Sequence, residues 1–214
     1  MSPNSPAAAL REWITQRLDP LEDHEPDQGL VASDFGPQSA DLAQEPAPLT
    51  PAAVLVGLVE REHGYSVLLT RRSDTLRRHT GQIAFPGGRR DPGETIWETA
   101  LRETEEEVGI SRSLVTLGGL STPYRTGTGF LVTPVVGFIA PGFSVTPNPA
   151  EVADVFETPF GFLMDPTNHE EHEREFAGQL RRFYAMTHEN RFIWGATAGM
   201  LRSLYDRLYG GAVA

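Results

Sequence analysis

The chain has 214 residues, a hydrophobic content of 39% and a formal net charge of −11, which is enough for one domain with a full hydrophobic core. It contains no cysteine, which excludes disulfides and thiolate metal sites and leads us to expect a cytoplasmic protein. The acidic balance argues against nucleic-acid binding, and the lack of a long apolar run or a signal-peptide pattern argues against a membrane partner.

The first 50 residues differ in composition from the rest of the chain. They contain one short predicted helix in ALREWITQRL, whose apolar face is formed by Leu10, Trp13, Ile14 and Leu18. This helix docks either on the body of the protein or on a second copy in a homodimer. The stretch that follows, to residue 51, is rich in Pro, Asp, Glu, Gln and Ser, which predicts a linker. We therefore divide the chain into an N-terminal region, 1–50, and a folded domain, 51–214.

The folded domain is predicted to begin with a β-hairpin. The runs AAVLVGLV (52–59) and YSVLLT (65–70) have the length and composition of strands, and EREHG between them can close the turn. Further strands are predicted at 114–120, 130–140, 152–158, 181–186 and 191–195.

Two helices are predicted among these strands. The first runs from Thr95 to Val108, because Thr95 and Glu98 match a capping box and Gly109 stands where a helix C-terminal glycine belongs. Its expected buried stripe is Trp97, Leu101, Thr104 and Val108; the second helix, 196–209, has the stripe Met200, Leu201, Leu204, Tyr205 and Leu208. Strands with two intercalated helices predict an α/β (α+β) sandwich, a mixed sheet with helices on its faces.

The first of these helices carries a cluster of glutamates. Glu103, Glu106 and Glu107 fall within one quadrant, away from the predicted apolar stripe. Arg102 lies four residues from both Glu98 and Glu106, so it can pair with either. A charge run of this kind also suits a solvated helix face. A glutamate cluster beside a glycine-rich loop, however, is an arrangement in which carboxylates and substrate phosphates hold Mg²⁺.

The spacing of these residues resembles a family motif. Gly88, then Glu94 after five residues, then the run 102–110 after seven more match the Nudix box at every defined position except Thr104, which stands at an aliphatic position. The resemblance implies the Nudix-type α/β/α sandwich and hydrolysis of a nucleoside diphosphate linked to another group. It also implies Mg²⁺ or Mn²⁺ held by the glutamates Glu103, Glu106 and Glu107.

A basic stretch precedes the box. The segments LLTRRS (68–73) and FPGG (85–88), with Arg77 and Gly81 between them, resemble the motif of the coenzyme A pyrophosphatase branch of the Nudix family. An arginine fork binds a phosphate group bidentately, which suits an anionic substrate such as coenzyme A. The substrate contacts implied are Arg71, Arg77, Gly81, Phe85, Gly87 and Gly88. Arg72, Arg78 and His79 can add to the same site, and a solvated basic turn is the alternative interpretation.

The resemblance implies attack of water on the pyrophosphate, giving 3′,5′-ADP and 4′-phosphopantetheine. Glu106 is one candidate for the general base; Glu151, outside the box, is another, unless it is only a capping or loop carboxylate. Arg102, the arginine of the box, is placed with the catalytic residues. Two other functions stay open: the same chemistry on ADP-ribose or a dinucleoside polyphosphate, and a non-catalytic nucleotide sensor, although a sensor should have lost box glutamates.

Two further features receive structural interpretations. His169 and His172 in NHEEHERE suggest a metal pair but have no evident third ligand, so a solvated loop is predicted there. Phe192 and Trp194 are predicted to be core aromatics.

Overall fold

Two long strands joined by a tight turn form the centre of the fold. The computed structural model describes residues 5–22, 32–33, 48–74, 81–176 and 179–210. Strand β2 (Thr50–Arg61) pairs antiparallel with β3 (Gly64–Arg72) up to the Arg61–Gly64 pair, so a two-residue turn closes the predicted hairpin. Gly64 has a φ of +122°, a conformation that favours glycine in such turns.

The central sheet is mixed, as predicted. Strand β8 (Phe130–Ile139) runs parallel to β2, while β9 (Val152–Pro159) pairs antiparallel with β3, and β6 (Val115–Leu120) pairs antiparallel with β8. The other strands of this sheet are short: β1 (Ala32–Ser33), β4 (Ile83–Ala84), β5 (Gly87–Arg89) and β7 (Tyr124–Arg125). Of these, β5 matters most for function, because it pairs with β2 beside the helix that carries the glutamates.

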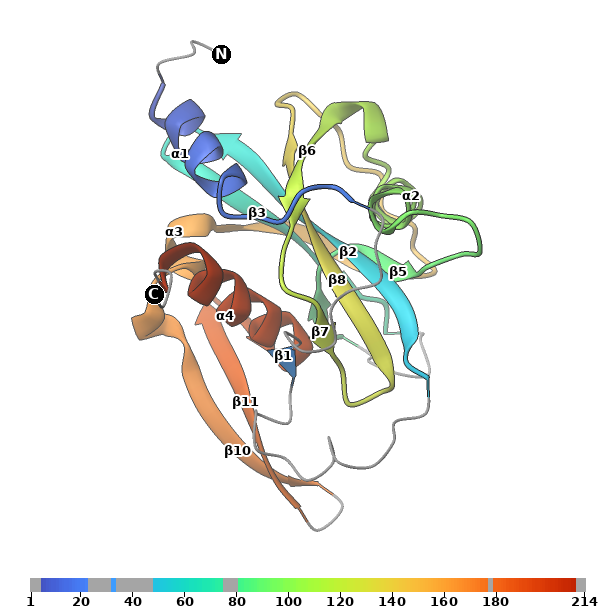
Figure 1. Cartoon of the computed structure of the whole chain (residues 1–214), viewed down its shortest axis with the longest axis vertical. Helices are drawn as coiled ribbons and strands as arrows, with labels where there is room; N and C mark the ends of the chain where they lie inside the picture. Colours follow the sequence, from blue (N-terminus) through green and yellow to red (C-terminus); the bar gives the residue numbers. More distant parts are fainter. Residues whose placement is uncertain (1–4, 23–31, 34–47, 75–80, 177–178, 211–214) are drawn as a thin grey trace.

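Helices cover both faces of the central sheet, which gives the predicted α/β sandwich (Figure 1). The side chains of β2 alternate as a strand requires: Leu55 packs with residues of α2 (Ile96–Val108), whereas Val56 packs with the cluster that includes α3 (Phe160–Leu163) and α4 (Ala196–Tyr209). Short 3₁₀ turns follow α2 at Arg112–Leu114 and α3 at Pro166–Asn168. The sheet therefore separates the glutamates of α2 from α4.

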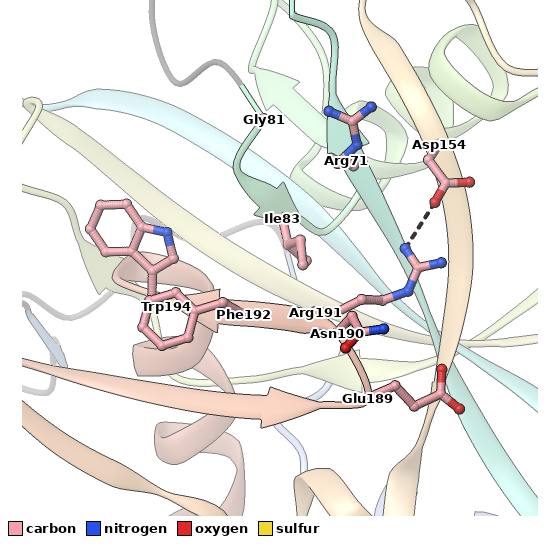
Figure 2. Close-up of a pocket in the computed structure, with 9 residues that line it drawn as sticks. All are labelled: Arg71, Gly81, Ile83, Asp154, Glu189, Asn190, Arg191, Phe192 and Trp194. Carbon is pink, nitrogen blue, oxygen red and sulfur yellow. Dashed lines mark hydrogen bonds and ion pairs between the residues drawn. The ribbon is translucent and has the colours of Figure 1, made fainter.

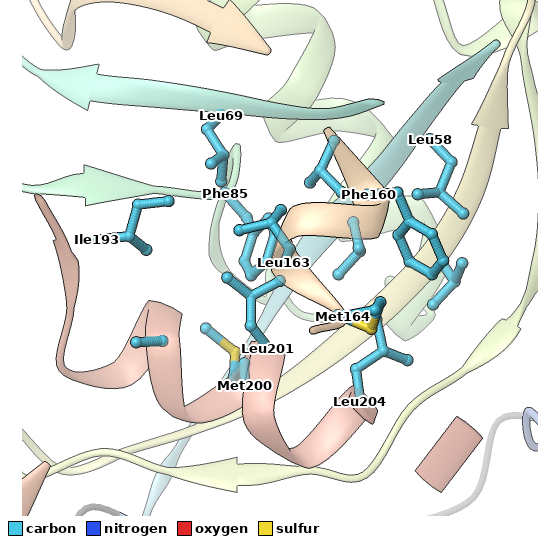
Figure 3. Packing of buried hydrophobic residues seen from close by; sticks show 14 of the residues in the cluster. Leu58, Leu69, Phe85, Phe160, Leu163, Met164, Ile193, Met200, Leu201 and Leu204 are labelled. Atoms are coloured by element: carbon cyan, nitrogen blue, oxygen red, sulfur yellow. The ribbon is translucent and has the colours of Figure 1, made fainter. Parts of the chain in front are cut away.

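The larger core lies on the α3 and α4 side and includes a residue that we predict to contact substrate (Figure 3). Phe85 is 3% exposed and belongs to the same cluster as Leu69, Leu163 and Met200. In this core the ring does not point toward α2, and a substrate contact of Phe85 stays a prediction. Phe85 instead anchors the chain just before Gly87 and Gly88, which do lie beside the glutamates.

A second, three-stranded sheet projects from the body and replaces the loop predicted around the histidines (Figure 1). It consists of β10 (Glu170–Phe176), β11 (Gln179–His188) and β12 (Arg191–Trp194). His169 is only 9% exposed and its Nε2 lies 2.8 Å from the carbonyl oxygen of Leu163, while His172 stacks on Phe183. The prediction of a solvated loop is wrong because cross-strand pairing with β11 accommodates this charged segment as an edge strand.

The N-terminal helix α1 (Pro6–Thr15) docks on the body of its own chain. Ile14 is fully buried in the larger core, and the hydroxyl of Tyr65 donates to the carbonyl oxygen of Ala7 at 3.3 Å. Beyond the helix, Arg207 of α4 forms an ion pair with Asp19. Residues 23–31 and 34–47 of the predicted linker lie outside the described residues. None of the helices in the described part of the chain is long and apolar enough to cross a membrane.

Candidate active site

Local signals set the ends of α2 and so fix the orientation of its glutamates. The Thr95 side chain accepts from the backbone N–H of Glu98, and the Glu98 carboxylate accepts from the N–H of Thr95 at 2.8 Å, which confirms the predicted capping box. Gly109 ends the helix with a φ of +74°. The buried face is turned relative to the prediction: Trp97 and Leu101 are only partly buried, while Ile96, Thr99, Ala100, Thr104, Glu107 and Val108 are buried.

Arg102 connects three glutamates of the box. Its guanidinium donates to both oxygens of Glu94, at 2.7 and 3.0 Å, to Glu103 at 2.8 Å, and to Glu106 at 3.3 Å. The hydrogen bond from Arg102 lowers the pKa of Glu94 to about 2. Glu98 is occupied by the cap, so of the two partners considered for Arg102 the structure shows Glu106. Arg102 therefore orients the carboxylates.

Glu103 lies directly against the glycine-rich loop. A Cβ added to Gly88 would lie 2.5 Å from the Cδ of Glu103, so only glycine leaves room for the carboxylate in this position. Burial raises the pKa of Glu103; the charges of Glu106 and Glu151 raise it further, against the hydrogen bond from Arg102. The loop and the helix thus hold a half-buried carboxylate at the glycine backbone.

Glu107 is the most buried charged group of the helix, with 4% exposure. Its Oε2 accepts from the backbone N–H of Gly87 at 3.2 Å, and burial raises its pKa to about 7. The nearby charge of Arg72 opposes this increase, whereas the charges of Glu151 and Glu103 add to it. Because neighbouring carboxylates repel the ionised form of Glu107, a cation bound beside it would be electrostatically favourable.

Glu151 lies outside the box in sequence but beside it in space. Its negative charge raises the pKa of both Glu103 and Glu107. The Asn148 side-chain amide donates to Glu151 at 3.1 Å, and the N–H of Asn148 donates to the carbonyl oxygen of Glu107 at 2.9 Å. The loop before β9 is therefore fastened to the C-terminal turn of α2, which brings Glu151 to the glutamate cluster. Glu105 points elsewhere and pairs with Arg112 at 3.1 Å.

The donors suit a hard divalent cation, although they do not yet form a closed coordination shell. In the part of the chain that the structure describes, no three Asp, Glu, His or Cys side chains are gathered into a group that could hold a metal ion. The chemistry of the donor set nevertheless fits Mg²⁺ or Mn²⁺, which take carboxylate oxygens, water and phosphate oxygens. Glu103 and Glu107 supply such oxygens under mutual repulsion that a cation would relieve, and Glu106 lies on the same helix.

The two adjacent arginines of the basic stretch face opposite sides of β3. Arg72 lies on the side of Glu107, and its buried Nε has no hydrogen-bond partner among the residues that the structure describes. Arg71 lines a cavity of about 500 Å³ on the other side and donates to Asp74 at 2.9 Å (Figure 2). Consecutive residues of a strand point to opposite faces, so the two arginines cannot serve one phosphate side by side. Arg77, Arg78 and His79 lie outside the described residues.

Several residues of this cavity are absent from the sequence prediction. Gly81, one of the predicted substrate contacts, lines it with a φ of +70°, and β12 contributes Arg191, Phe192 and Trp194. Phe192 is 45% exposed, so its prediction as a core aromatic is wrong: on the short edge strand β12 it points away from the core in which Ile193 is buried. No sequence signal distinguished the two faces of β12.

Comparison with known proteins gives consistent matches over most of the chain. The NUDIX domain family matches residues 48–179. A protein of Photorhabdus laumondii named uncharacterized Nudix hydrolase NudL is 43% identical over 158 residues, which cover 73% of this chain and 84% of that protein. A protein of Yersinia enterocolitica with the same name is also 43% identical over 158 residues, covering 73% and 80%. Among solved structures, a C. elegans Ap4A hydrolase in a binary complex covers 51% of this chain and 80% of its own, with 22% identity and a TM-score of 0.46.

Proposed function

This chain belongs to the Nudix family and is therefore a hydrolase of pyrophosphate bonds, and from this premise we propose that its substrate is coenzyme A or an acyl derivative. The products would be 3′,5′-ADP and (acyl-)4′-phosphopantetheine. We expect the reaction to take place in the cytoplasm, where coenzyme A is used and where a chain without cysteines needs no oxidising environment.

The observation that carries this proposal is that the glutamates of the box and Arg72 of the basic stretch lie on the same side of β3, at the Gly87–Gly88 backbone. Glu103 and Glu107 lie under the Gly87–Gly88 backbone, and Arg72 faces Glu107 from the basic stretch. The pyrophosphate of a substrate would be bound between these carboxylates and arginines, and the remaining part of the substrate would extend toward the cavity behind Arg71.

The acidic residues would act through a divalent cation. Glu103 and Glu107, with Glu106, would hold Mg²⁺ or Mn²⁺, which neutralises charge on the pyrophosphate and lowers the pKa of bound water. Arg102 keeps these carboxylates in position through its hydrogen bonds. The Gly87 N–H, which donates to Glu107, keeps that side chain directed toward the loop.

Two carboxylates can take the proton of the attacking water. Glu106 accepts a hydrogen bond from Arg102 and has a side-chain exposure of 57%. Glu151 accepts a hydrogen bond from Asn148, and its charge raises the pKa of both Glu103 and Glu107. A general base typically contributes about 10²–10⁴-fold to the rate. Glu106→Gln and Glu151→Gln are measured separately at saturating Mg²⁺. The base is the variant that loses kcat by at least about 100-fold without needing more Mg²⁺, whereas a lost metal ligand raises the Mg²⁺ concentration required.

The substrate is tested by incubating the full chain with coenzyme A and Mg²⁺ in ¹⁸O-labelled water and identifying the products by mass. We expect one ¹⁸O atom in either 3′,5′-ADP or 4′-phosphopantetheine, and the labelled product identifies the phosphorus that is attacked. ADP-ribose and a dinucleoside polyphosphate, assayed under the same conditions, serve as competing substrates. If either one has a higher kcat/KM than coenzyme A, that compound is the substrate and the proposal is wrong. If none of the three is hydrolysed, the protein is better described as a nucleotide sensor.

A further inference from the structure

The cavity behind β3 combines features that single it out as a binding site. It has a volume of about 500 Å³, within the range of small-molecule sites, and its wall includes Phe192 and Trp194 from the projecting sheet. Phe192 is 45% exposed although it is a large aromatic residue. Figure 2 shows this aromatic pair on one side of the cavity and Arg71 with Arg191 on the other.

The aromatic wall is continuous and supported from behind. Trp194 packs edge-on against Phe183 with ring centroids 5.8 Å apart, and His172 stacks on Phe183 at 5.5 Å and meets Phe192 edge-on at 6.2 Å. These contacts hold the rings in place on one face of the projecting sheet. A rigid aromatic surface that is exposed to a cavity is well suited to stacking against a planar ring, since little side-chain freedom is lost on binding.

The opposite wall is polar, and the charges of its described residues balance. Arg191 donates to Asp154 at 2.8 Å and its guanidinium lies 3.6 Å from the centroid of the Phe156 ring, which fixes its plane. With Arg71 and Glu189, the charged side chains that the described residues contribute to the cavity are two positive and two negative. A neutral ring with hydrogen-bonding edges fits this balance better than a phosphate does, and a guanidinium has five N–H donors, of which one carboxylate uses only part.

The cavity also lies within reach of the glutamate cluster. Ile83 lines the cavity, and Gly87, four residues further along the chain, bonds to Glu107. Four residues span at most about 14 Å, so this separation is within the length of one nucleotide, which would pass around the end of β3 that carries Arg71 and Arg72. Thr197 donates to the carbonyl oxygen of Ile83 at 2.9 Å and so ties α4, which directly follows β12, to this connecting segment.

We propose that the cavity lined by Phe192, Trp194, Arg71 and Arg191 binds the purine base of the substrate, with Arg71 at the rim toward the phosphates. This assignment rests on the proposed function, because the base is that of the nucleotide half of coenzyme A. The pantetheine half then lies on the other side of the scissile bond. The projecting sheet is thereby the element that distinguishes nucleotide from non-nucleotide pyrophosphates.

The test uses the two products as separate probes, with binding to the full chain measured by calorimetry in the presence of Mg²⁺. Phe192→Ala should weaken the binding of 3′,5′-ADP by about tenfold, the scale of a lost base–aromatic stack. The affinity for 4′-phosphopantetheine should stay within about twofold of the wild-type value. Phe192→Trp keeps a stacking surface and should retain wild-type affinity. Tyr209→Ala is the matched control, because Tyr209 is 46% exposed and lies outside the cavity.

Each outcome decides one of the two proposals. Loss of 4′-phosphopantetheine binding in Phe192→Ala, or unchanged binding of both products, overturns the assignment of the base, as does a wild-type chain that binds no 3′,5′-ADP. If the wild type does not hydrolyse coenzyme A but Phe192→Ala still weakens 3′,5′-ADP alone, the assignment of the cavity stands and the proposed substrate fails. The melting temperature of each variant checks whether a loss of binding is caused by unfolding.

Discussion

At the residue scale, the site depends on carboxylates that are held where charge is costly. Glu107 is 4% exposed, yet a backbone N–H and the charge of Arg72 favour its ionised form. Among the described residues, the buried Nε of Arg72 has no hydrogen-bond partner, and a bound phosphate could satisfy it. Binding of the proposed cation and anionic substrate would offset the free-energy cost of burying these groups.

Removing the charge of Glu107 should abolish turnover without unfolding the chain. Glu107→Gln keeps the shape of the side chain and an oxygen that accepts from Gly87, but it loses the charge that we propose holds a cation. We expect kcat with Mg²⁺ to fall at least about 100-fold, the scale of losing one key electrostatic group. Glu105→Gln is the matched control on the same helix, because Glu105 pairs with Arg112 away from the site. Near-normal activity of Glu107→Gln would remove this residue from the metal site.

The same substitution should have a pH-dependent effect on stability in the absence of metal. The pKa of Glu107 is raised from 4.5 to about 7 in the folded chain, so the folded state binds the proton more tightly than the unfolded state does. The ionised carboxylate therefore lowers stability above about pH 7, and this cost disappears as the pH falls toward 4.5. The size is on the order of 3 kcal/mol, from 1.36 kcal/mol for each unit of pKa shift.

Urea unfolding with a chelator present measures this effect. At pH 8, Glu107→Gln should be more stable than the wild type, and the two midpoints should converge toward pH 4.5. A wild type that is the more stable of the two at pH 8 would show that burial does not dominate the electrostatics of Glu107.

At the element scale, the short segment from Phe85 to Gly88 joins the core to α2, the helix that carries the glutamates. Phe85 is packed in the larger core, the carbonyl oxygen of Pro86 accepts from the N–H of Leu55 at 2.8 Å, and Gly87 and Gly88 then lie against Glu107 and Glu103. A Cβ on Gly87 would come within 2.6 Å of the Cα of Val54, so the segment passes too close to β2 for a side chain there. These close contacts allow the backbone to reach the carboxylates.

Gly88→Ala should separate activity from stability. The added methyl group would meet the end of the Glu103 side chain, which can move aside at little cost in folding free energy but then leaves its position in the site. Because small displacements of a reacting group can cost about 10²-fold in rate, we expect kcat to fall about 10–100-fold with a melting temperature near that of the wild type. Gly161→Ala in α3, where a Cβ meets nothing within 4 Å, is the matched control. Full activity of Gly88→Ala would contradict the packing of this loop on Glu103.

At the scale of the whole molecule, the N-terminal helix forms part of the same core as α3 and α4. Ile14→Ala removes a fully buried side chain from that core and should lower the free energy of unfolding by about 2–5 kcal/mol, as other large-to-small core substitutions do. Glu12→Ala, on the exposed side of α1, is the control and should change stability by less than about 0.5 kcal/mol. Chemical denaturation compares the three chains, and equal stability of all three would show that α1 contributes nothing to the folded body.

The arrangement of the molecule places two binding surfaces on opposite sides of β3. The glutamates lie on the α2 side, and the cavity lies on the side of the projecting sheet, with a register shift in β3–β9 pairing between Arg71 and Arg72. One strand end therefore supplies an arginine to each surface. In the proposed function, this division would allow a basic stretch of adjacent residues to contact two different parts of one substrate.

Sequence alone determined the family and most of the longer elements, with β10 as an exception, because these depend on short-range signals. The capping box at Thr95, the terminal glycine Gly109, the apolar strand-length runs of the β2–β3 hairpin and the spacing of the Nudix box are all contained within windows of a few residues to about twenty. Burial was decided only by the tertiary structure. Which face of α2 packs inward, the position of Phe85 in the core and the exposure of Phe192 depend on contacts between distant segments, and strand pairing also separates Arg71 from Arg72 and brings Glu151 to Glu107.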